Sequence, residues 1–139
     1  MRNYLARIEL TEKDKTLSTG LLGETLFERW HCNNYQGEVL HRQLADNDYK
    51  GVDFIDNKGI KYQVKGSRGA TFTFNCSLEL LKTHLRADVY ICIQIKEKVA
   101  YIEFMCDANN ILDRAKESFQ FENSCFVWAK DLQQYKINL

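Results

Sequence analysis

The sequence predicts an α/β domain in which a mixed β-sheet is flanked by helices. Helical periodicity over residues 21–32 alternates along the chain with strand-like segments. Residues 89–95 form a nearly continuous apolar run, which is expected at the centre of a sheet covered on both faces. A chain of 139 residues suits a single domain, and we assign residues 1–139 to it.

The N-terminal third of the chain predicts one helix and at least one strand. Residues 4–10 suit either a short strand or an extended arm, and the sequence leaves that choice open. Residues 21–32 predict a helix, with Ser18 or Thr19 as its N-cap. Residues 38–44 predict a strand. The helix should bury Leu22, Leu26, Phe27 and Trp30, and should direct Glu24, Glu28 and His31 outward, with His31 on the surface.

The middle of the chain predicts a β-hairpin. The run Asp56-Asn57-Lys58-Gly59 has Asp at the first turn position and Gly at the fourth, which is typical of a type I turn followed by a left-handed glycine. A three-residue loop of this kind pairs Phe54 with Tyr62, and hence Asp53 with Gln63.

This register predicts two chemically different faces for the hairpin. Residues directly opposite each other share a face, and side chains repeat every second residue. We therefore expect Asp53, Gln63 and Lys65 together on a polar face. The other face is expected to be apolar and to carry Val52, Phe54, Tyr62 and Val64.

The remaining chain predicts alternating helices and strands. A second helix is expected at residues 77–86, where Leu78, Leu81 and Leu85 form one stripe. The later elements are expected as strands at 89–95 and 99–104, a helix at 108–119, a strand at 125–128, and a helix or turn at 130–135.

Composition predicts a cytoplasmic protein. The sequence has no apolar run of about 18 residues and no basic segment followed by an apolar stretch, so we expect neither a membrane span nor a signal peptide. Its five cysteines are odd in number and widely spaced, with no CxxC pair. This pattern favours buried reduced thiols over a zinc site or disulfides.

The charge balance is neutral, whereas many DNA-binding proteins are basic. Lys plus Arg and Asp plus Glu each total 19. The middle of the chain is nevertheless positive, and a local patch can neutralise several phosphates on a neutral protein. We expect Lys61, Lys65, Arg68 and Lys82 to bind nucleic acid, and dimerisation would double this patch.

The polar face of the hairpin offers parts for hydrolysing a phosphodiester. Asp53 and Gln63 supply oxygen ligands for a metal, and Lys65 supplies a cation beside an attacking water. Glu24 on the preceding helix is placed to reach the same face. Gly66 follows Lys65, where a backbone without a side chain can approach a phosphate. The alternative is an ordinary surface hairpin with a polar outer face.

The spacing Gly51-Val52-Asp53 followed by Gln63-Val64-Lys65-Gly66-Ser67 resembles the PD-(D/E)XK nuclease superfamily, closest to its Mrr-like and Holliday-junction-resolvase-like branches. The resemblance covers residues 20–95 and implies a restriction-endonuclease-like fold. Two positions depart from the family pattern. Val52 stands where the family has Pro, and Gln63 is neutral where most members are acidic.

The resemblance implies a role for each residue of the motif. Asp53 would be the principal metal ligand, Gln63 the second ligand, Lys65 the residue that orients or activates water, and Glu24 an accessory carboxylate. The Val64 carbonyl, waters and a substrate phosphate would complete the coordination of Mg²⁺ or Mn²⁺. The metal would lower the pKa of its bound water and offset charge on the scissile phosphate.

Two functional classes follow from these observations. The first is a metal-dependent endonuclease that acts on DNA, with branched or modified DNA among the candidate substrates, as a homodimer. The second is a non-catalytic nuclease-fold module that binds nucleic acid or a partner protein, which is suggested by Gln63 and by the neutral net charge.

Overall fold

A six-stranded mixed sheet is the centre of the computed structural model, which describes residues 4–35, 37–43, 52–69, 73–77, 87–114, 116–117 and 124–128. The strand order of this large sheet is β1-β7-β6-β4-β3-β2. Its strands are β1 (Ala6–Glu9), β2 (Leu40–Arg42), β3 (Phe54–Asp56), β4 (Lys61–Ser67), β6 (Val89–Ile95) and β7 (Val99–Asp107). Strands β4 and β6 are parallel, and the other described pairs are antiparallel.

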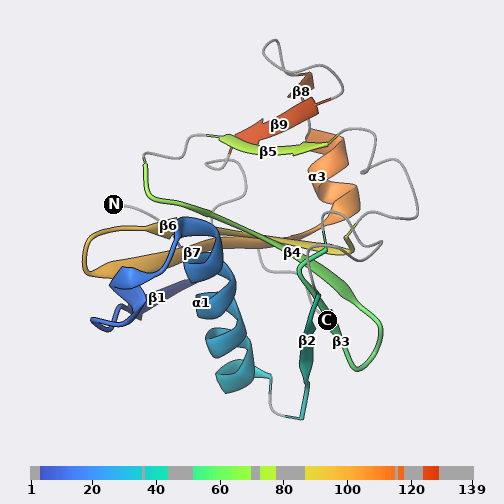
Figure 1. The fold of residues 1–139 in the computed structure, drawn as a ribbon. Coiled ribbons are helices and arrows are strands. Elements are labelled where there is room, and N and C mark those ends of the chain that lie inside the picture. The colour runs from blue at the N-terminus through green and yellow to red at the C-terminus, as the bar shows by residue number, and fades with distance from the viewer. Residues whose placement is uncertain are drawn as a thin grey trace.

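Helices and a second, smaller sheet cover the two faces of the large sheet (Figure 1). Helix α1 (Thr19–Asn34) lies on one face. Helix α3 (Ala108–Arg114) lies on the other, with the small sheet of β5 (Thr73–Ser77), β9 (Ser124–Trp128) and β8 (Lys116–Glu117). This arrangement confirms the predicted α/β class with a mixed sheet and flanking helices.

The two faces carry two separate hydrophobic cores. Ile91 and Ile93 of β6 belong to the core that includes the α1 residues Leu22, Leu26 and Phe27. Tyr90 and Cys92 belong to the core that includes Ile111 of α3. All seven residues of β6 are buried, as the apolar run at 89–95 predicted for a central strand.

Most predicted elements are present, with shifted ends. Residues 4–10, which suited either a strand or an arm, contain strand β1. Helix α1 begins at Thr19, directly after the predicted N-cap Ser18, and ends at Asn34, two residues later than expected. Strand β2 is shorter than predicted, whereas β7 extends to Asp107. Strand β9 begins one residue earlier than predicted. Residues 78–86 and 130–135 of the predicted helices lie outside the described residues.

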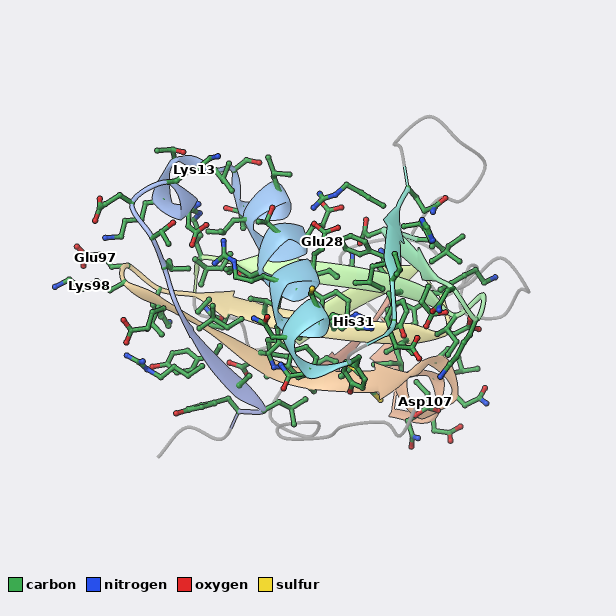
Figure 2. The ribbon with its side chains drawn as sticks, turned by 90° about the horizontal axis from the view of Figure 1, so that it is seen from below. Lys13, Glu28, His31, Glu97, Lys98 and Asp107 are labelled. Carbon is green, nitrogen blue, oxygen red and sulfur yellow. The ribbon has the colours of Figure 1, made fainter. Side chains whose placement is uncertain are left out.

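Two predictions about helices are wrong. The helix expected at 108–119 ends at Arg114, and strand β8 follows at Lys116. His31 is not on the surface: its side chain is buried on the sheet side of α1, where it stacks on Tyr35 with ring centroids 4.8 Å apart (Figure 2). His31 lies one turn after Phe27, so it extends the buried stripe of the helix. Strand β5 was not predicted.

The predicted register of the hairpin is confirmed where the two strands pair. Phe54 lies opposite Tyr62, and the Asp56 N–H donates to the Ile60 carbonyl at 3.0 Å. Gly59 has φ +87°, the left-handed conformation that the turn requires. The Asp56 carboxylate also accepts the Tyr62 hydroxyl at 2.8 Å, which fixes the hairpin from inside.

The register does not continue to Asp53, and here the prediction is wrong. Strand β3 begins at Phe54, and the Asp53 N–H donates to the Tyr62 carbonyl at 2.8 Å instead of pairing with Gln63. Asp53 and Phe54 are thus both opposite Tyr62, as in a β-bulge. The extra residue moves Val52 to the opposite core, with Tyr90 and Ile111, away from the face predicted for it.

Three cysteines with described side chains form no disulfide bond. Cys92 and Cys106 are buried, as expected, whereas Cys32 is exposed. The side chains of Cys76 and Cys125 lie outside the described part of the structure. No helix among the described residues is long and apolar enough to cross a membrane.

Candidate functional site

Two carboxyl groups meet just before the start of β3, where β4 continues beyond its pairing with β3 and remains paired with β6. Asp53 precedes β3, and Glu24 projects from α1; their side chains are hydrogen-bonded to each other. The Asp53 carboxylate also contacts the backbone of β4, where its Oδ2 accepts the Val64 N–H at 2.8 Å. The structure therefore brings together Glu24 and Asp53, as the sequence predicted, although through the bulge and not through a pair with Gln63.

A contact between two glycines places Glu24 at this position. A Cβ on Gly23 would lie 3.3 Å from the Gly66 Cα, and a Cβ on Gly66 would lie 3.0 Å from the Thr19 carbonyl oxygen. Helix α1 can therefore approach β4 so closely only because both residues lack side chains. The open side of Gly66 faces α1, and so its role is in packing and not in approaching a phosphate.

Burial disfavours the ionised form of both carboxyl groups. Burial raises the pKa of Asp53, and the Val64 N–H and the Lys65 charge oppose that rise. Burial also raises the pKa of Glu24, and the neighbouring Asp53 charge raises it further. The two carboxyls therefore ionise less readily than isolated ones, and a bound cation would favour their ionised forms.

Lys65 and Gln63 lie on the other side of the sheet from α1. Their parallel partners on β6 are Cys92 and Tyr90, which belong to the core under α3. Both side chains are half-buried. Asp53 therefore lies between Glu24 on the α1 side and Lys65 on the α3 side, and the Lys65 charge acts on its carboxylate.

The Val64 backbone lies at the same edge. Successive residues of a strand direct their backbone groups to alternate sides, and the Tyr62 carbonyl is bonded to Asp53 on the β3 side. The Val64 carbonyl consequently faces the β3 side too, where its N–H bonds Asp53.

These groups fit an oxygen-liganded divalent cation. No group of three or more His, Cys, Asp or Glu within the described ranges could hold a metal. Two carboxyls and a backbone carbonyl remain at this edge, and they suit Mg²⁺, which usually takes one or two carboxylates and keeps several waters. The Gln63 side chain lies on the α3 side of the sheet, so the structure does not bring its amide to the carboxyl pair. The raised pKa values point the same way as the carboxyls, because a bound cation would favour the ionised form of both.

The residues predicted to bind nucleic acid have different surroundings. Lys61 and Lys65 are both on β4, whereas Lys82 lies outside the described residues. Arg68 bonds the start of α1 through the Thr19 hydroxyl at 2.8 Å and the Leu17 carbonyl at 2.6 Å. Arg68 is exposed, yet two of its donors are engaged within the protein.

Arg42 and Glu28 were missed by the sequence reasoning. Arg42 is the β-sheet partner of Phe54, next to Asp53, and its Nη2 donates to Glu28 Oε1 at 3.2 Å. Glu28 lies one turn after Glu24 on the flank of α1 near β2 (Figure 2). The sequence carried no signal for this pair, since it depends on the pairing of β2 with β3.

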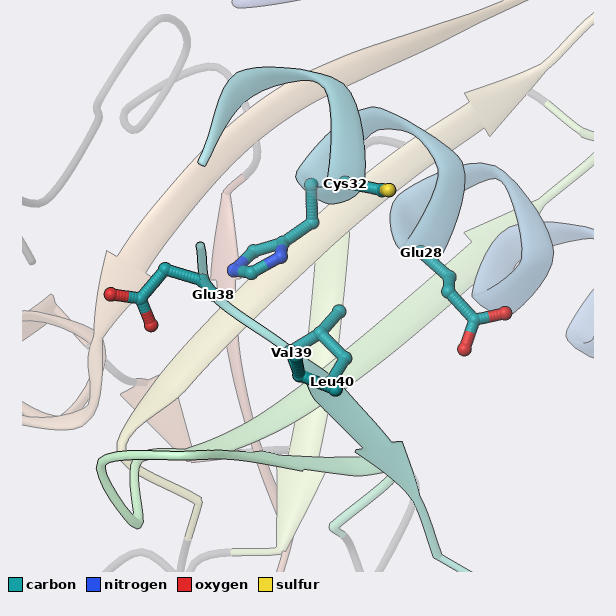
Figure 3. Close-up of a pocket in the computed structure, with 6 residues that line it drawn as sticks. Glu28, Cys32, Glu38, Val39 and Leu40 are labelled. Atoms are coloured by element: carbon teal, nitrogen blue, oxygen red, sulfur yellow. The ribbon is translucent and has the colours of Figure 1, made fainter. Parts of the chain in front are cut away.

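A small pocket lies beside this region, between the end of α1 and β2 (Figure 3). Its volume is about 210 Å³, and it is lined by Glu28, His31, Cys32, Glu38, Val39 and Leu40. None of the residues predicted for the site lines it. Burial lowers the pKa of His31, so the imidazole is neutral and acts as part of the wall.

Comparison of the chain with protein-family models, with curated proteins and with solved structures gives no match.

Proposed function

We propose that the protein is a divalent-metal-dependent endonuclease that hydrolyses phosphodiester bonds in DNA. The observation that carries this proposal is the hydrogen-bonded pair of Glu24 and Asp53 beside the Val64 backbone, with the charge of Lys65 acting on it. The mixed sheet with flanking helices suits a restriction-endonuclease-like fold, which remains part of the proposal. Branched and modified DNA are the candidate substrates, and we propose a homodimer that acts in the cytoplasm.

Three groups would hold Mg²⁺ or Mn²⁺. They are the Asp53 carboxylate, the Val64 carbonyl and, as an accessory ligand, Glu24. When bound, the metal supplies a water of lowered pKa and offsets charge on the scissile phosphate.

The protein's own residues would position the reactants. Lys65 would orient the attacking water or stabilise the charge that develops on the phosphate, as a compact cation on a rigid strand. Cation binding would lower the pKa values of Glu24 and Asp53, so that any proton they hold is exchanged for the cation. The close contact between α1 and β4 would keep Glu24 in place during this exchange.

A cleavage assay tests this proposal. Purified protein is incubated with linear, supercoiled, single-stranded and branched DNA, in Mg²⁺, in Mn²⁺ and in chelator. We expect cleavage of at least one form with metal, none with chelator, and none by Asp53→Ala. No cleavage of any form, or cleavage that survives Asp53→Ala, would contradict it.

One observation favours the second class, a non-catalytic module that binds nucleic acid or a partner protein. Gln63 brings no charge to the site, and Glu24 and Asp53 are the two carboxyls that the described residues bring together there. This class predicts that wild-type protein binds DNA or a protein without cleaving DNA under any of the metal conditions. DNA binding by this class would still fall steeply with salt, because phosphate contacts release counterions.

A further inference from the structure

Arg42 is held beside the carboxyl pair by the sheet itself. It is paired with Phe54, and the next residue, Gln43, donates its N–H to the Asp53 carbonyl at 2.9 Å. The guanidinium carbon lies 5.2 Å from the centroid of the Phe54 ring, within the range of a cation–π contact. Its orientation is therefore restrained by a buried aromatic ring.

Most of the hydrogen-bonding capacity of Arg42 is unused among the described residues. A guanidinium has five N–H donors, and a single bond is formed here, at 3.2 Å to Glu28. Arg29 and Arg68 contrast with it. Arg29 makes two bonds to the Asp14 carboxylate, and Arg68 makes two bonds at the start of α1. The Arg42 side chain is also one-third exposed, at 33%.

The charge of Arg42 reaches both carboxyls. It lowers the pKa of Asp53 and of Glu24, against the larger effect of burial on each. Because Arg42 shares a face with Phe54, which packs in the core under α1, it flanks the pair on the α1 side. Lys65 flanks it on the α3 side.

We propose that Arg42 binds a non-bridging oxygen of the DNA phosphate that is held at the Glu24–Asp53 pair, and that it exchanges its single bond to Glu28 for this contact. A guanidinium fork matches a phosphate with two parallel hydrogen bonds and is charged at every relevant pH. The site would then hold the phosphate between two cations, Arg42 and Lys65. This inference rests on the proposed binding of DNA at this site.

The test measures binding of a fluorescein-labelled DNA duplex in Ca²⁺, with the length of the DNA checked afterwards. The variants are Arg42→Gln, Arg42→Lys, Glu28→Gln and Arg7→Gln. Arg7 is the matched control: it is an arginine that forms an ion pair with Glu9, and it lies on the opposite edge strand β1. Thermal unfolding of each variant shows whether the fold is intact.

Arg42→Gln is expected to weaken DNA binding about tenfold and to reduce the salt slope by about one ion. Arg42→Lys should keep the salt slope, because the positive charge remains. It should lose part of the affinity for DNA, because lysine lacks the two parallel donors of the guanidinium. Arg7→Gln and Glu28→Gln should bind as wild type does. The inference is overturned if Arg42→Gln binds like Arg7→Gln, or if Glu28→Gln weakens binding as much as Arg42→Gln. The proposed function fails separately, if the wild-type protein neither binds nor cleaves DNA.

Discussion

Asp53 is the residue on which the candidate site depends. Substitutions that keep or remove its contacts can distinguish an effect on cleavage from an effect on stability. Its carboxylate accepts the Val64 N–H and is bonded to Glu24. Asp53→Asn keeps an acceptor for the Val64 N–H but loses the charge that would hold a metal. We expect this variant to lose cleavage by at least about a hundredfold with an unchanged Tm.

Asp53→Ala is expected to lose cleavage equally but also to lower the stability by about 1 kcal/mol, because the partly buried Val64 N–H loses its acceptor. Single-turnover cleavage and thermal unfolding measure the two effects. Glu97→Gln is the control, since Glu97 is an exposed acid in the turn between β6 and β7 (Figure 2). Equal activity in Asp53→Asn and Glu97→Gln would place the chemistry elsewhere.

The two lysines of β4 form a matched pair for a second prediction. Lys61 and Lys65 share a face of the strand and lie about 13 Å apart. Of these two lysines, Lys65 is the one whose charge lowers the pKa of Asp53. Lys65→Ala should abolish single-turnover cleavage and leave metal affinity within a few fold, whereas Lys61→Ala should weaken DNA binding and keep the cleavage rate. Loss of rate in both variants, or in neither, would contradict this assignment.

At this scale the sequence predicted that Glu24 and Asp53 lie near each other, but not the contacts that bring them together. The predicted pair of Asp53 with Gln63 is replaced by a bulge opposite Tyr62. Arg42 could not be predicted, because its position follows from a pairing of β2 with β3 that no local pattern encodes. His31 was assigned to the surface because its polarity outweighed its place one turn after Phe27.

The contact between α1 and β4 is the element-scale feature that holds the site together. A Cβ on Gly66 would lie 3.0 Å from a backbone oxygen and 3.4 Å from the Gly23 Cα, neither of which can rotate away. Gly66→Ala should therefore displace α1, lower the stability by about 1–3 kcal/mol and reduce cleavage by moving Glu24.

Gly20→Ala is the control for that prediction, because nothing lies within 4 Å of its Cβ position on the same helix. It should leave cleavage unchanged and raise the stability by about 0.5–1 kcal/mol, since alanine is the better helix former. Thermal unfolding and cleavage assays compare the two variants. A Gly66→Ala variant as stable and active as Gly20→Ala would show that the close approach is dispensable.

The hairpin shows which features of an element can be predicted from the local sequence. The register of the paired strands followed from the turn, because Gly59 readily adopts the left-handed conformation that closes the loop. The β-bulge at Asp53 did not follow from the turn, because we expected the alternation of polar and apolar residues to continue through Asp53. That one-residue shift sends Val52 into the opposite core and turns the Asp53 carboxylate toward the Val64 N–H.

The whole molecule places its candidate site at the junction of two cores. The buried run of β6 separates the core under α1 from the core under α3, and the run itself was evident from the sequence. The order of strands around it was not, because long-range pairing leaves no periodic signal. Net neutrality describes the whole chain, whereas Arg42, Lys61 and Lys65, which we propose to bind DNA, lie on β2 and β4.

The stability of the whole molecule should report the raised pKa values of Glu24 and Asp53. Their pKa values are raised above 4.5 and 3.8, so the folded state binds more protons than the unfolded state in that range. Stability therefore falls as the pH rises through the folded pKa values. Asp14 acts oppositely: its bond to Arg29 lowers its pKa from 3.8 to about 2, so its contribution is lost only in stronger acid.

We therefore expect the double variant Glu24→Gln, Asp53→Asn to have a higher Tm than wild type at pH 7 in chelator. The difference should shrink as the pH falls to 4, because the folded wild-type carboxyls ionise less at lower pH. Mg²⁺ or Mn²⁺ should raise the Tm of wild type at pH 7, by binding the ionised carboxyls of the folded state, and should leave the double variant unchanged. Thermal melts from pH 4 to 7, with and without metal, measure all three effects. A Tm difference independent of pH would contradict the raised pKa values, and an equal response of both proteins to metal would show that the pair does not bind the cation.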